Sequence, residues 1–345
     1  MKVGIVGGGV IGLSVAWELL RRGGHEVTVY DADPARGAGL VAAGMLAPTA
    51  EANFGEEALQ ELMLESMRRW PGFAAELGAA TGMPLGYRTD GTLLVALTDD
   101  DLTDVRRLVD YYRRAGTPIE PLGGRQLREL EPLLSPRVRG GARAGGDHQV
   151  DPRLLLAALR SLPVRHERRD VADLSTLRDD VIVVANGTGL AGSTGLPVRP
   201  VKGQLLRLRG PEPLLTHVVR GVAHGRHVYL VPRADGELVV GATEEERGAD
   251  LTVTAGGVLD LLRPAADLLP GVAELALAET LAGLRPGTPD NAPVIGHLRD
   301  LVYVAGGHHR NGVLLAPVTA HVVADLVTKG STDVDIAPFA AVRFT

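Results

Sequence analysis

The spacing of hydrophobic residues changes along this chain, and the change predicts two kinds of structure. At the N-terminus the apolar run Val3–Val6 precedes apolar residues at helical spacing between Gly12 and Arg22, and the apolar run Val27–Tyr30 follows. This order predicts a strand–helix–strand unit. The continuous apolar run Val181–Ala185 predicts a buried parallel strand. Leu301–Ala305 predicts an apolar strand late in the chain.

The middle of the chain has a different pattern, because apolar and polar residues alternate between Leu205 and Ala242. Alternation predicts an antiparallel sheet. A hairpin turn is expected at Thr89–Thr92. Helical spacing and cap residues predict further helices at Phe54–Leu77 with an interruption at Pro71, at Asp99–Ala115, from Asp151-Pro152 onward, at Ala255–Leu269 and at Gly312–Leu326. The pattern as a whole predicts an α/β fold with a β-rich insertion.

Composition and charge exclude several classes of protein. The 345 residues carry a formal net charge of −6 and no dense run of Lys or Arg, so we expect no nucleic-acid partner. The chain has no cysteine, which excludes disulfides, thiolate metal sites, iron–sulfur clusters and cysteine-linked cofactors. Met1-Lys2 leads directly into the first strand, and the apolar stretch 312–327 is broken by Pro317, His321 and Asp325. We therefore expect a cytoplasmic protein without a signal peptide or a membrane span.

A glycine motif stands between the first strand and the first helix. In Gly7-x-Gly9-x-x-Gly12, the first glycine permits a tight turn, the second lets the backbone approach a pyrophosphate, and the third lets helix and strand pack closely. Asp31 ends the second strand, 19 residues after Gly12, where a carboxylate accepts hydrogen bonds from ribose hydroxyls; Asp33 is a weaker alternative. The motif predicts a dinucleotide site but does not distinguish FAD from a nicotinamide cofactor.

Further segments resemble the D-amino-acid oxidase-like superfamily of flavoproteins and, within it, the glycine oxidases of the thiazole (thiamine) pathway. The similar segments occur in the family's order over nearly the whole chain: Ala43–Pro48, Val150–Pro152, Pro200–Gln204, Tyr229–Arg233, Gly241–Thr243, Ala282–Asp290 and Gly307–Pro317. The resemblance implies a discontinuous, Rossmann-like FAD-binding domain at 1–82, 140–196 and 288–345. It also implies a smaller α+β substrate-binding domain, with a mainly antiparallel sheet, at 83–139 and 197–287.

The resemblance further implies which residues bind a non-covalent FAD. They are Gly7, Gly9, Val10, Ile11, Gly12, Asp31, Ala43, Gly44, Met45, Val171, Gly307, His308, His309, Arg310, Asn311, Gly312, Val313 and Leu314. The helix expected from Gly312 would stabilise negative charge on the reduced flavin. His308 and His309 are adjacent, so their side chains point apart, and we expect no metal site.

The resemblance implies hydride transfer from the substrate Cα to flavin N5, so the protein's main task is to position a small amino acid. Arg285 is the candidate carboxylate clamp, because a guanidinium binds a carboxylate through two parallel hydrogen bonds. Tyr229 would donate a second bond, and Arg310 would lie near the mouth of the site or on the other side of the substrate. The expected substrates are glycine and molecular oxygen. Thiazole synthase would act downstream on the imine, and a homo-oligomer is expected by analogy alone.

The chain departs from the family pattern at several positions. Leu281 stands where Trp is usual, His309 where Phe or Tyr is usual, Glu244 where one relative has Met, and the segment from Val171 to Val181 is short. We interpret Glu244 as a solvated residue. We interpret Lys202, one of only three lysines, as a surface position on a strand.

These departures leave four alternatives open. They are a sarcosine or small D-amino-acid oxidase, an FAD amino-acid dehydrogenase with an acceptor other than oxygen, a nicotinamide-dependent dehydrogenase, and a non-catalytic flavin-binding protein.

Overall fold

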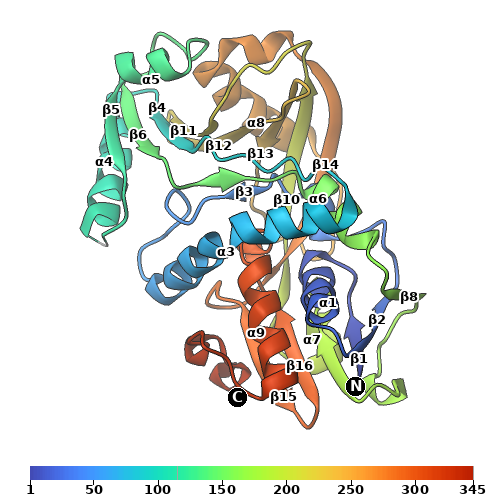
Figure 1. Cartoon of the computed structure of the whole chain (residues 1–345). Helices are drawn as coiled ribbons and strands as arrows, with labels where there is room; N and C mark the ends of the chain where they lie inside the picture. Colours follow the sequence, from blue (N-terminus) through green and yellow to red (C-terminus); the bar gives the residue numbers. More distant parts are fainter. Residues whose placement is uncertain (115, 345) are drawn as a thin grey trace.

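The computed structural model describes residues 1–114 and 116–344, and its two large sheets form the lower and upper parts of the molecule in Figure 1. The lower sheet has six strands in the order β15-β16-β9-β1-β2-β8. Every neighbouring pair is parallel except β15 with β16. The strands are β1 Lys2–Val6, β2 Glu26–Asp31, β8 Arg165–Arg168, β9 Val181–Val184, β15 Val294–Arg299 and β16 Val302–Gly306. The predicted strand–helix–strand unit, the parallel strand β9 and the late strand β16 are confirmed.

Helices cover the lower sheet because each presents an apolar stripe to it. Helix α1 (Val10–Arg22) packs against α9 (Ala316–Lys329) and α6 (Pro152–Arg160), and α3 (Glu57–Thr81) packs on α9. Their buried side chains form the largest hydrophobic core. Helix α6 begins where the sequence predicts, because the Asp151 carboxylate accepts from the N–H groups of Arg153 and Leu154.

The upper sheet has eight strands in the order β14-β10-β13-β12-β11-β4-β6-β5. All described pairs are antiparallel except β11 with β4, so the expected antiparallel sheet is present. Helix α8 (Ala255–Leu268) packs on one face of this sheet, and α4 (Asp99–Arg114) and α5 (Gly124–Leu130) lie at its far end. The strands are β4 Thr92–Ala96, β5 Glu120–Gly123, β6 Gly140–Ala144, β10 Arg199–Arg209, β11 Val218–Ala223, β12 Arg226–Pro232, β13 Glu237–Gly241 and β14 Ala276–Gly287.

Short elements connect the two sheets. Strands β3 (Met45–Leu46) and β7 (His148–Gln149) form a two-stranded ribbon between them. The remaining elements are α2 Ala38–Val41, α7 Leu190–Thr194 and the 3₁₀ turns Leu174–Thr176, Gly187–Gly189, Pro270–Glu274, His309–Asn311, Ala337–Phe339 and Ala341–Phe344. Between Val171 and Val181 the only regular element is the 3₁₀ turn Leu174–Thr176, so this part of the lower domain is as short as its sequence indicates.

Four predictions about elements need correction. Helix α3 continues through Pro71, because proline removes only one N–H there, its ring is exposed, and buried Trp70 and Ala74 anchor both sides. The Thr89–Thr92 hairpin does not form. Instead Arg88 pairs with Gln149 through two backbone hydrogen bonds of 2.9 Å, and β4 pairs with β6 and β11.

The other two corrections concern boundaries. The last helix begins at Ala316 and not at Gly312, because residues 309–315 form a 3₁₀ turn and further turns before Pro317 occupies the first helical turn. Strand β6 (140–144) lies in the upper sheet, so a domain boundary at residue 140 is too early. The predicted end of α4, Ala115, lies outside the described residues.

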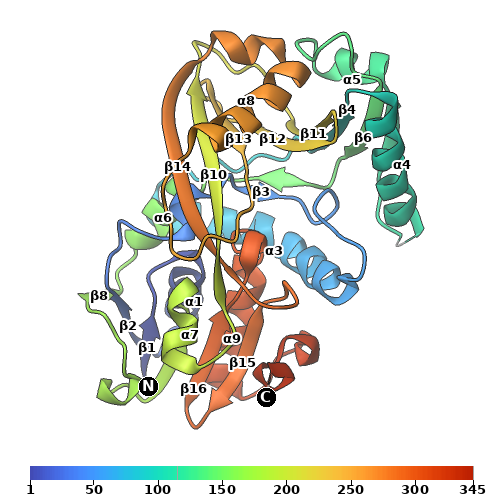
Figure 2. The same ribbon diagram turned by 180° about the vertical axis from the view of Figure 1, so that it is seen from behind.

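Two long strands connect the upper sheet with the lower part of the molecule, as Figure 2 shows from behind. Strands β10 and β14 pair along almost their whole length, from Arg199↔Gly287 to Arg209↔Ala276. Gly287 then forms a bridge to His308, which follows β16 of the lower sheet. Among the described residues, no helix is long and apolar enough to cross a membrane.

Candidate active site

The glycine turn has the geometry that the motif predicts. Gly7 has a φ of +115°, and a Cβ there would collide with the backbone of Ala185 in the neighbouring strand end. A Cβ on Gly12 would collide with the carbonyl oxygen of Gly7, so this glycine lets α1 approach the turn closely. A Cβ on Gly9, the N-cap of α1, would meet nothing within 4 Å. The backbone at Gly9 therefore faces open space at the positive end of a helix dipole.

The carboxylate of Asp31 is fixed beside this turn. Its Oδ2 accepts a 2.8 Å hydrogen bond from the Gly8 N–H, and its Oδ1 accepts from the Asp33 N–H at 3.0 Å. Asp33 therefore supports Asp31 and does not replace it. Val10 and Ile11 begin α1 with buried side chains, while Val171 packs in the cluster that contains Val6 and Tyr30.

The segment Ala43–Met45 lies against the face of the upper sheet. Gly44 has a φ of +80°, a Cβ there would collide with the Val150 carbonyl oxygen, and its own carbonyl accepts from the Val150 N–H at 2.9 Å. Ala43 packs in a small apolar cluster on the sheet, against which Met45, Tyr229 and Leu281 also pack. The segment is thus held on the same apolar cluster as Tyr229 of the candidate clamp.

Two glycines of the upper sheet make room for the candidate clamp. The guanidinium of Arg285, on β14, lies over Gly203 of β10, where any Cβ would collide with it. The hydroxyl of Tyr229, on β12, lies over Gly241 of β13 in the same way. The two side chains interact, and the structure therefore brings Arg285 and Tyr229 together as the sequence interpretation requires.

Arg285 has no carboxylate partner among the described residues. Its Nη1 donates to the carbonyl oxygens of Thr243 at 3.2 Å and Lys202 at 3.5 Å, and the guanidinium also interacts with the Tyr229 hydroxyl. Burial raises the pKa of Tyr229 to about 12, although the charge of Arg285 acts in the opposite direction. The tyrosine hydroxyl therefore stays protonated and can donate a hydrogen bond. A free guanidinium beside a phenol donor is suited to binding a carboxylate.

Arg310 differs from Arg285 because it has an internal partner. Its Nη2 lies 3.1 Å from Glu56 Oε2 and 3.4 Å from the Glu51 carbonyl oxygen. Glu56 also accepts from Asn291 at 3.3 Å. Arg310 thus ties the 3₁₀ turn after β16 to the loop before α3, and its placement near the mouth of a substrate site remains a prediction.

His308 and His309 have different surroundings. His308 Nε2 lies 3.0 Å from the Thr319 hydroxyl, and burial lowers the pKa of His308 to about 3. His309 has a φ of +47°, and neither of its buried ring nitrogens has a hydrogen-bond partner among the described residues. The rest of the predicted segment, Gly307–Leu314, forms the turns that precede α9, and the Asn311 Oδ1 atom is likewise buried and unpaired.

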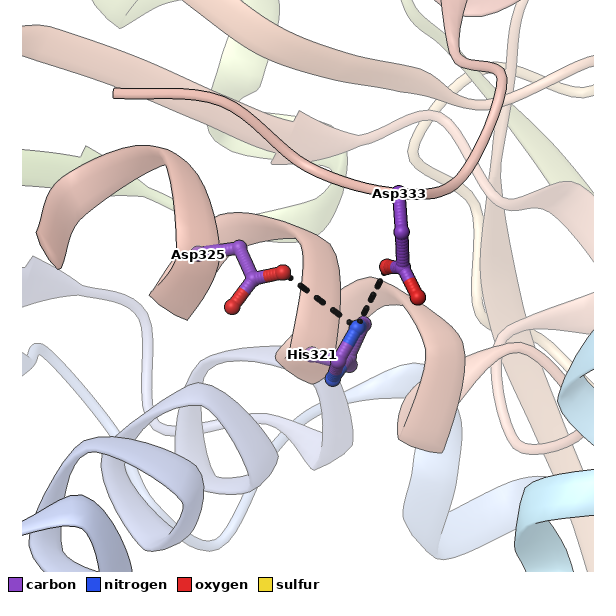
Figure 3. Close-up of side chains that lie close together, drawn as sticks. All are labelled: His321, Asp325 and Asp333. Atoms are coloured by element: carbon purple, nitrogen blue, oxygen red, sulfur yellow. Dashed lines mark hydrogen bonds and ion pairs between the residues drawn. The ribbon is translucent and has the colours of Figure 1, made fainter. Parts of the chain in front are cut away.

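One group outside this region has ligand atoms close enough to hold a metal ion, as Figure 3 shows. His321 Nε2 lies 3.3 Å from Asp325 Oδ2 and 2.8 Å from Asp333 Oδ1. Asp325 is already paired with Arg22 at 2.6 Å and with Lys329 at 2.8 Å. The group is therefore a charge-balanced ion-pair network that fixes the C-terminal segment to α9.

The surface interpretation of Lys202 is wrong. Its side chain is fully buried, and its Nζ lies 2.7 Å from Asp250 Oδ2 and 3.7 Å from Glu245 Oε2. Lys202 anchors the segment that follows β13 on the face of β10 opposite Gly203, because neighbouring strand residues point to opposite faces. Glu244 has a side chain that is 64% exposed, in agreement with the solvated interpretation.

The sequence interpretation missed three charged residues beside the clamp. Arg220, the β11 partner of Tyr229, forms an ion pair with Glu51 at 3.2 Å. Glu56 holds Arg310 as described above. Their only sequence signal is position: Glu51 and Glu56 follow the Ala43–Pro48 segment, and Arg220 alternates with buried valines on a strand.

The described residues fit a bound dinucleotide whose redox ring lies toward the upper sheet. The turn at Gly9 offers open space and helix N–H groups for phosphates, and Asp31 offers a fixed acceptor for a ribose. At the other end, the Asn311 Oδ1 atom is buried without a partner among the described residues. The individual contacts to FAD remain predictions for all of the residues named from the sequence.

Comparison with known proteins identifies the family. The family described as FAD dependent oxidoreductase (DAO) matches residues 2–326. Glycine oxidase of Geobacillus kaustophilus is 34% identical over 99% of this chain and 96% of that protein. The crystal structure of glycine oxidase from the same species superimposes with a TM-score of 0.91 at 33% identity, covering 100% of this chain and 99% of that one.

A third relative is longer than this chain. The bifunctional protein ThiO/ThiG of Trichormus variabilis is 35% identical over 99% of this chain but only 54% of its own length. The family match covers most of the chain, and the fold agrees with that of the glycine oxidase structure. The chain therefore belongs to the DAO family of FAD-dependent oxidoreductases.

Proposed function

We propose that the chain oxidises glycine, or a similarly small amino acid, at its Cα. The observation that carries the proposal is the guanidinium of Arg285, which has no carboxylate partner among the described residues, beside the protonated Tyr229 hydroxyl. The other arginines near this site have carboxylate partners: Arg310 has Glu56, Arg220 has Glu51 and Arg199 has Glu246. An arginine without a counterion in a partly buried site is ready to bind the carboxylate of a ligand.

The protein's contribution to the reaction is mainly positioning. Arg285 would hold the substrate carboxylate through two parallel hydrogen bonds, and Tyr229 would donate a further one. Both side chains project from strands of the same sheet, so their separation is fixed before the substrate arrives. The FAD, when bound, supplies the hydride acceptor. The balanced reaction is glycine plus oxygen plus water giving glyoxylate, ammonia and hydrogen peroxide.

The proposal extends to the fate of the product. The similarity to the bifunctional protein ThiO/ThiG supports a role in thiamine biosynthesis, with the imine passing to a thiazole synthase. Molecular oxygen is the proposed electron acceptor. The cytoplasmic location and the homo-oligomeric state inferred from the sequence remain predictions.

The decisive experiment is an anaerobic absorbance spectrum of the purified holoenzyme before and after addition of glycine. We expect a flavin spectrum that bleaches with glycine, and that shifts without bleaching on addition of acetate, which has a carboxylate but no amine. Subsequent admission of air should release hydrogen peroxide.

Other outcomes distinguish the alternatives. A spectrum that stays yellow with glycine but bleaches with sarcosine or a small D-amino acid would assign a different substrate. Bleaching without peroxide release in air would indicate a dehydrogenase. A flavin that no amine reduces would indicate a non-catalytic flavoprotein.

A further inference from the structure

His309 lies in the candidate site with unused hydrogen-bonding capacity. The 3₁₀ turn His309–Asn311 holds it at a φ of +47°, a backbone conformation that non-glycine residues rarely adopt. Its side chain is only 3% exposed, yet Nδ1 and Nε2 have no hydrogen-bond partner among the described residues. Buried polar atoms are normally hydrogen-bonded, so an unpaired imidazole beside a proposed ligand site points to a missing partner.

The ring of His309 packs on β14, the strand that carries Arg285. Its Cδ2 is 3.7 Å from the place that a Cβ of Gly287 would occupy, so the ring packs over β14 at Gly287. Gly287 and Arg285 are two residues apart on this strand, so both positions face the same side. The charge of Arg285 acts on the pKa of His309, so the imidazole lies within electrostatic range of the guanidinium that would hold the ligand.

The imidazole is uncharged, which determines the kind of bond it can make. Burial, together with the charges of Arg310, Arg285 and Arg199, lowers the pKa of His309 to about 4. A neutral imidazole has one N–H donor and one acceptor nitrogen. The carboxylate nearest to the ring is Glu244, whose Oε1 lies 4.0 Å from Nε2 and can attract the N–H of that nitrogen. Nδ1 would then be left as an acceptor.

We propose that His309 is a specificity-determining residue that accepts a hydrogen bond from the amino group of the substrate held by Arg285. This inference rests on the proposed function, because it concerns the ligand of that clamp. Arg285 and Tyr229 provide donors for the carboxylate, whereas His309 provides an acceptor for the α-substituent. The site therefore selects small acids whose Cα carries a group with a hydrogen to donate.

The test compares two unreactive ligands that differ only in such a group. Acetate has a methyl group where glycolate has a hydroxymethyl group, and both carry the carboxylate for Arg285. Dissociation constants are obtained by titrating the oxidised holoenzyme and following the flavin absorbance. One neutral hydrogen bond is worth about a fivefold difference in affinity, so we expect glycolate to bind about fivefold tighter than acetate.

Substitution of His309 should change the ratio of the acetate and glycolate dissociation constants. His309→Phe keeps a planar ring without an acceptor and should bring the ratio close to one. His309→Asn tolerates the left-handed backbone, keeps an acceptor and should retain part of the preference. His227→Phe, at an exposed position of β12, is the matched control and should keep the full preference. FAD content reports whether each variant is folded.

The outcomes separate the two proposals. If Arg285→Ala weakens the binding of both ligands but His309→Phe keeps the preference for glycolate, the clamp stands and the inference about His309 is overturned. If Arg285→Ala leaves the binding of acetate unchanged, the clamp itself is wrong, and the role of His309 is overturned with it.

Discussion

The dinucleotide turn and the substrate clamp are built in opposite ways. The turn uses residues close in sequence, since Gly7, Gly9, Gly12 and Asp31 all belong to one strand–helix–strand unit. The clamp places Tyr229 of β12 and Arg285 of β14 together, on strands that are not neighbours in the sheet. The turn is therefore encoded by local spacing, whereas the clamp exists only after the upper sheet has formed.

Removal of the clamp arginine should have the largest effect. Arg285→Ala deletes both charge-assisted bonds to the substrate carboxylate, so we expect KM for glycine to rise about 1000-fold, equivalent to about 4 kcal/mol. FAD should stay bound, because the dinucleotide turn is unaffected. Steady-state kinetics and flavin absorbance measure the two quantities.

The matched control for this variant is Arg209→Ala. Arg209 lies on β10 far from Arg285, is about half exposed and pairs with Asp235. The Arg209→Ala variant should leave KM for glycine unchanged. An Arg285→Ala enzyme with normal KM would remove that residue from the substrate site.

Two glycine variants should separate folding from cofactor binding within the turn. Gly12→Ala forces a methyl group against the Gly7 carbonyl, so we expect the apoprotein to lose about 3 kcal/mol of unfolding free energy in urea. Gly9→Ala places a methyl group in open space and should leave that free energy nearly unchanged. It should nevertheless weaken FAD binding at least about tenfold, because the methyl group occupies the approach to the pyrophosphate. Normal FAD affinity in Gly9→Ala would contradict this assignment.

Replacement of His309 should have a smaller effect, which concerns how the stability of the fold depends on pH. Burial holds the pKa of His309 at about 4, below the usual 6.5, so the unfolded chain binds a proton more readily than the native one. Stability is therefore lost as pH falls from about 6.5 towards 4. Between pH 7.5 and pH 5, we expect the free energy of unfolding to fall by roughly 1–2 kcal/mol less in His309→Phe than in the wild type. Urea unfolding of the apoproteins at both pH values measures this difference.

The exposed His227 again supplies the comparison, because His227→Phe should keep the wild-type pH dependence. If both variants behave alike, the buried imidazole of His309 is not responsible for the loss. The result bears on the fold alone and is independent of any substrate.

The same contrast explains what the sequence could predict. Strands β1 and β2, helix α1 and the cap of α6 follow from local spacing and were predicted from it. Arg285 and Tyr229 were identified through a family resemblance, since no local rule distinguishes them in an arginine-rich chain. Lys202 is buried because the segment around Asp250, 48 residues later in the chain, folds over it. The strand pattern alone therefore predicted an exposed side chain where the structure has a buried one.

The interruption at Pro71 and the hairpin at Thr89–Thr92 failed for a related reason. Both predictions used local rules, and in both cases tertiary packing overrode them: buried Trp70 keeps α3 continuous, and Gln149 takes the pairing of Arg88. The missed residues Glu51 and Arg220 are adjacent only in three dimensions. Contacts between distant segments leave little trace in a single sequence.

The alternation of the chain between its two sheets has a consequence for how the protein can be divided into fragments. The six-stranded sheet takes β1 from residues 2–6 and β16 from residues 302–306, and every strand of the eight-stranded sheet lies between them in the sequence. Any single break of the chain between β1 and β16 therefore divides the six-stranded sheet between two fragments. The six-stranded sheet therefore cannot be expressed as one uninterrupted piece that leaves out the eight-stranded sheet.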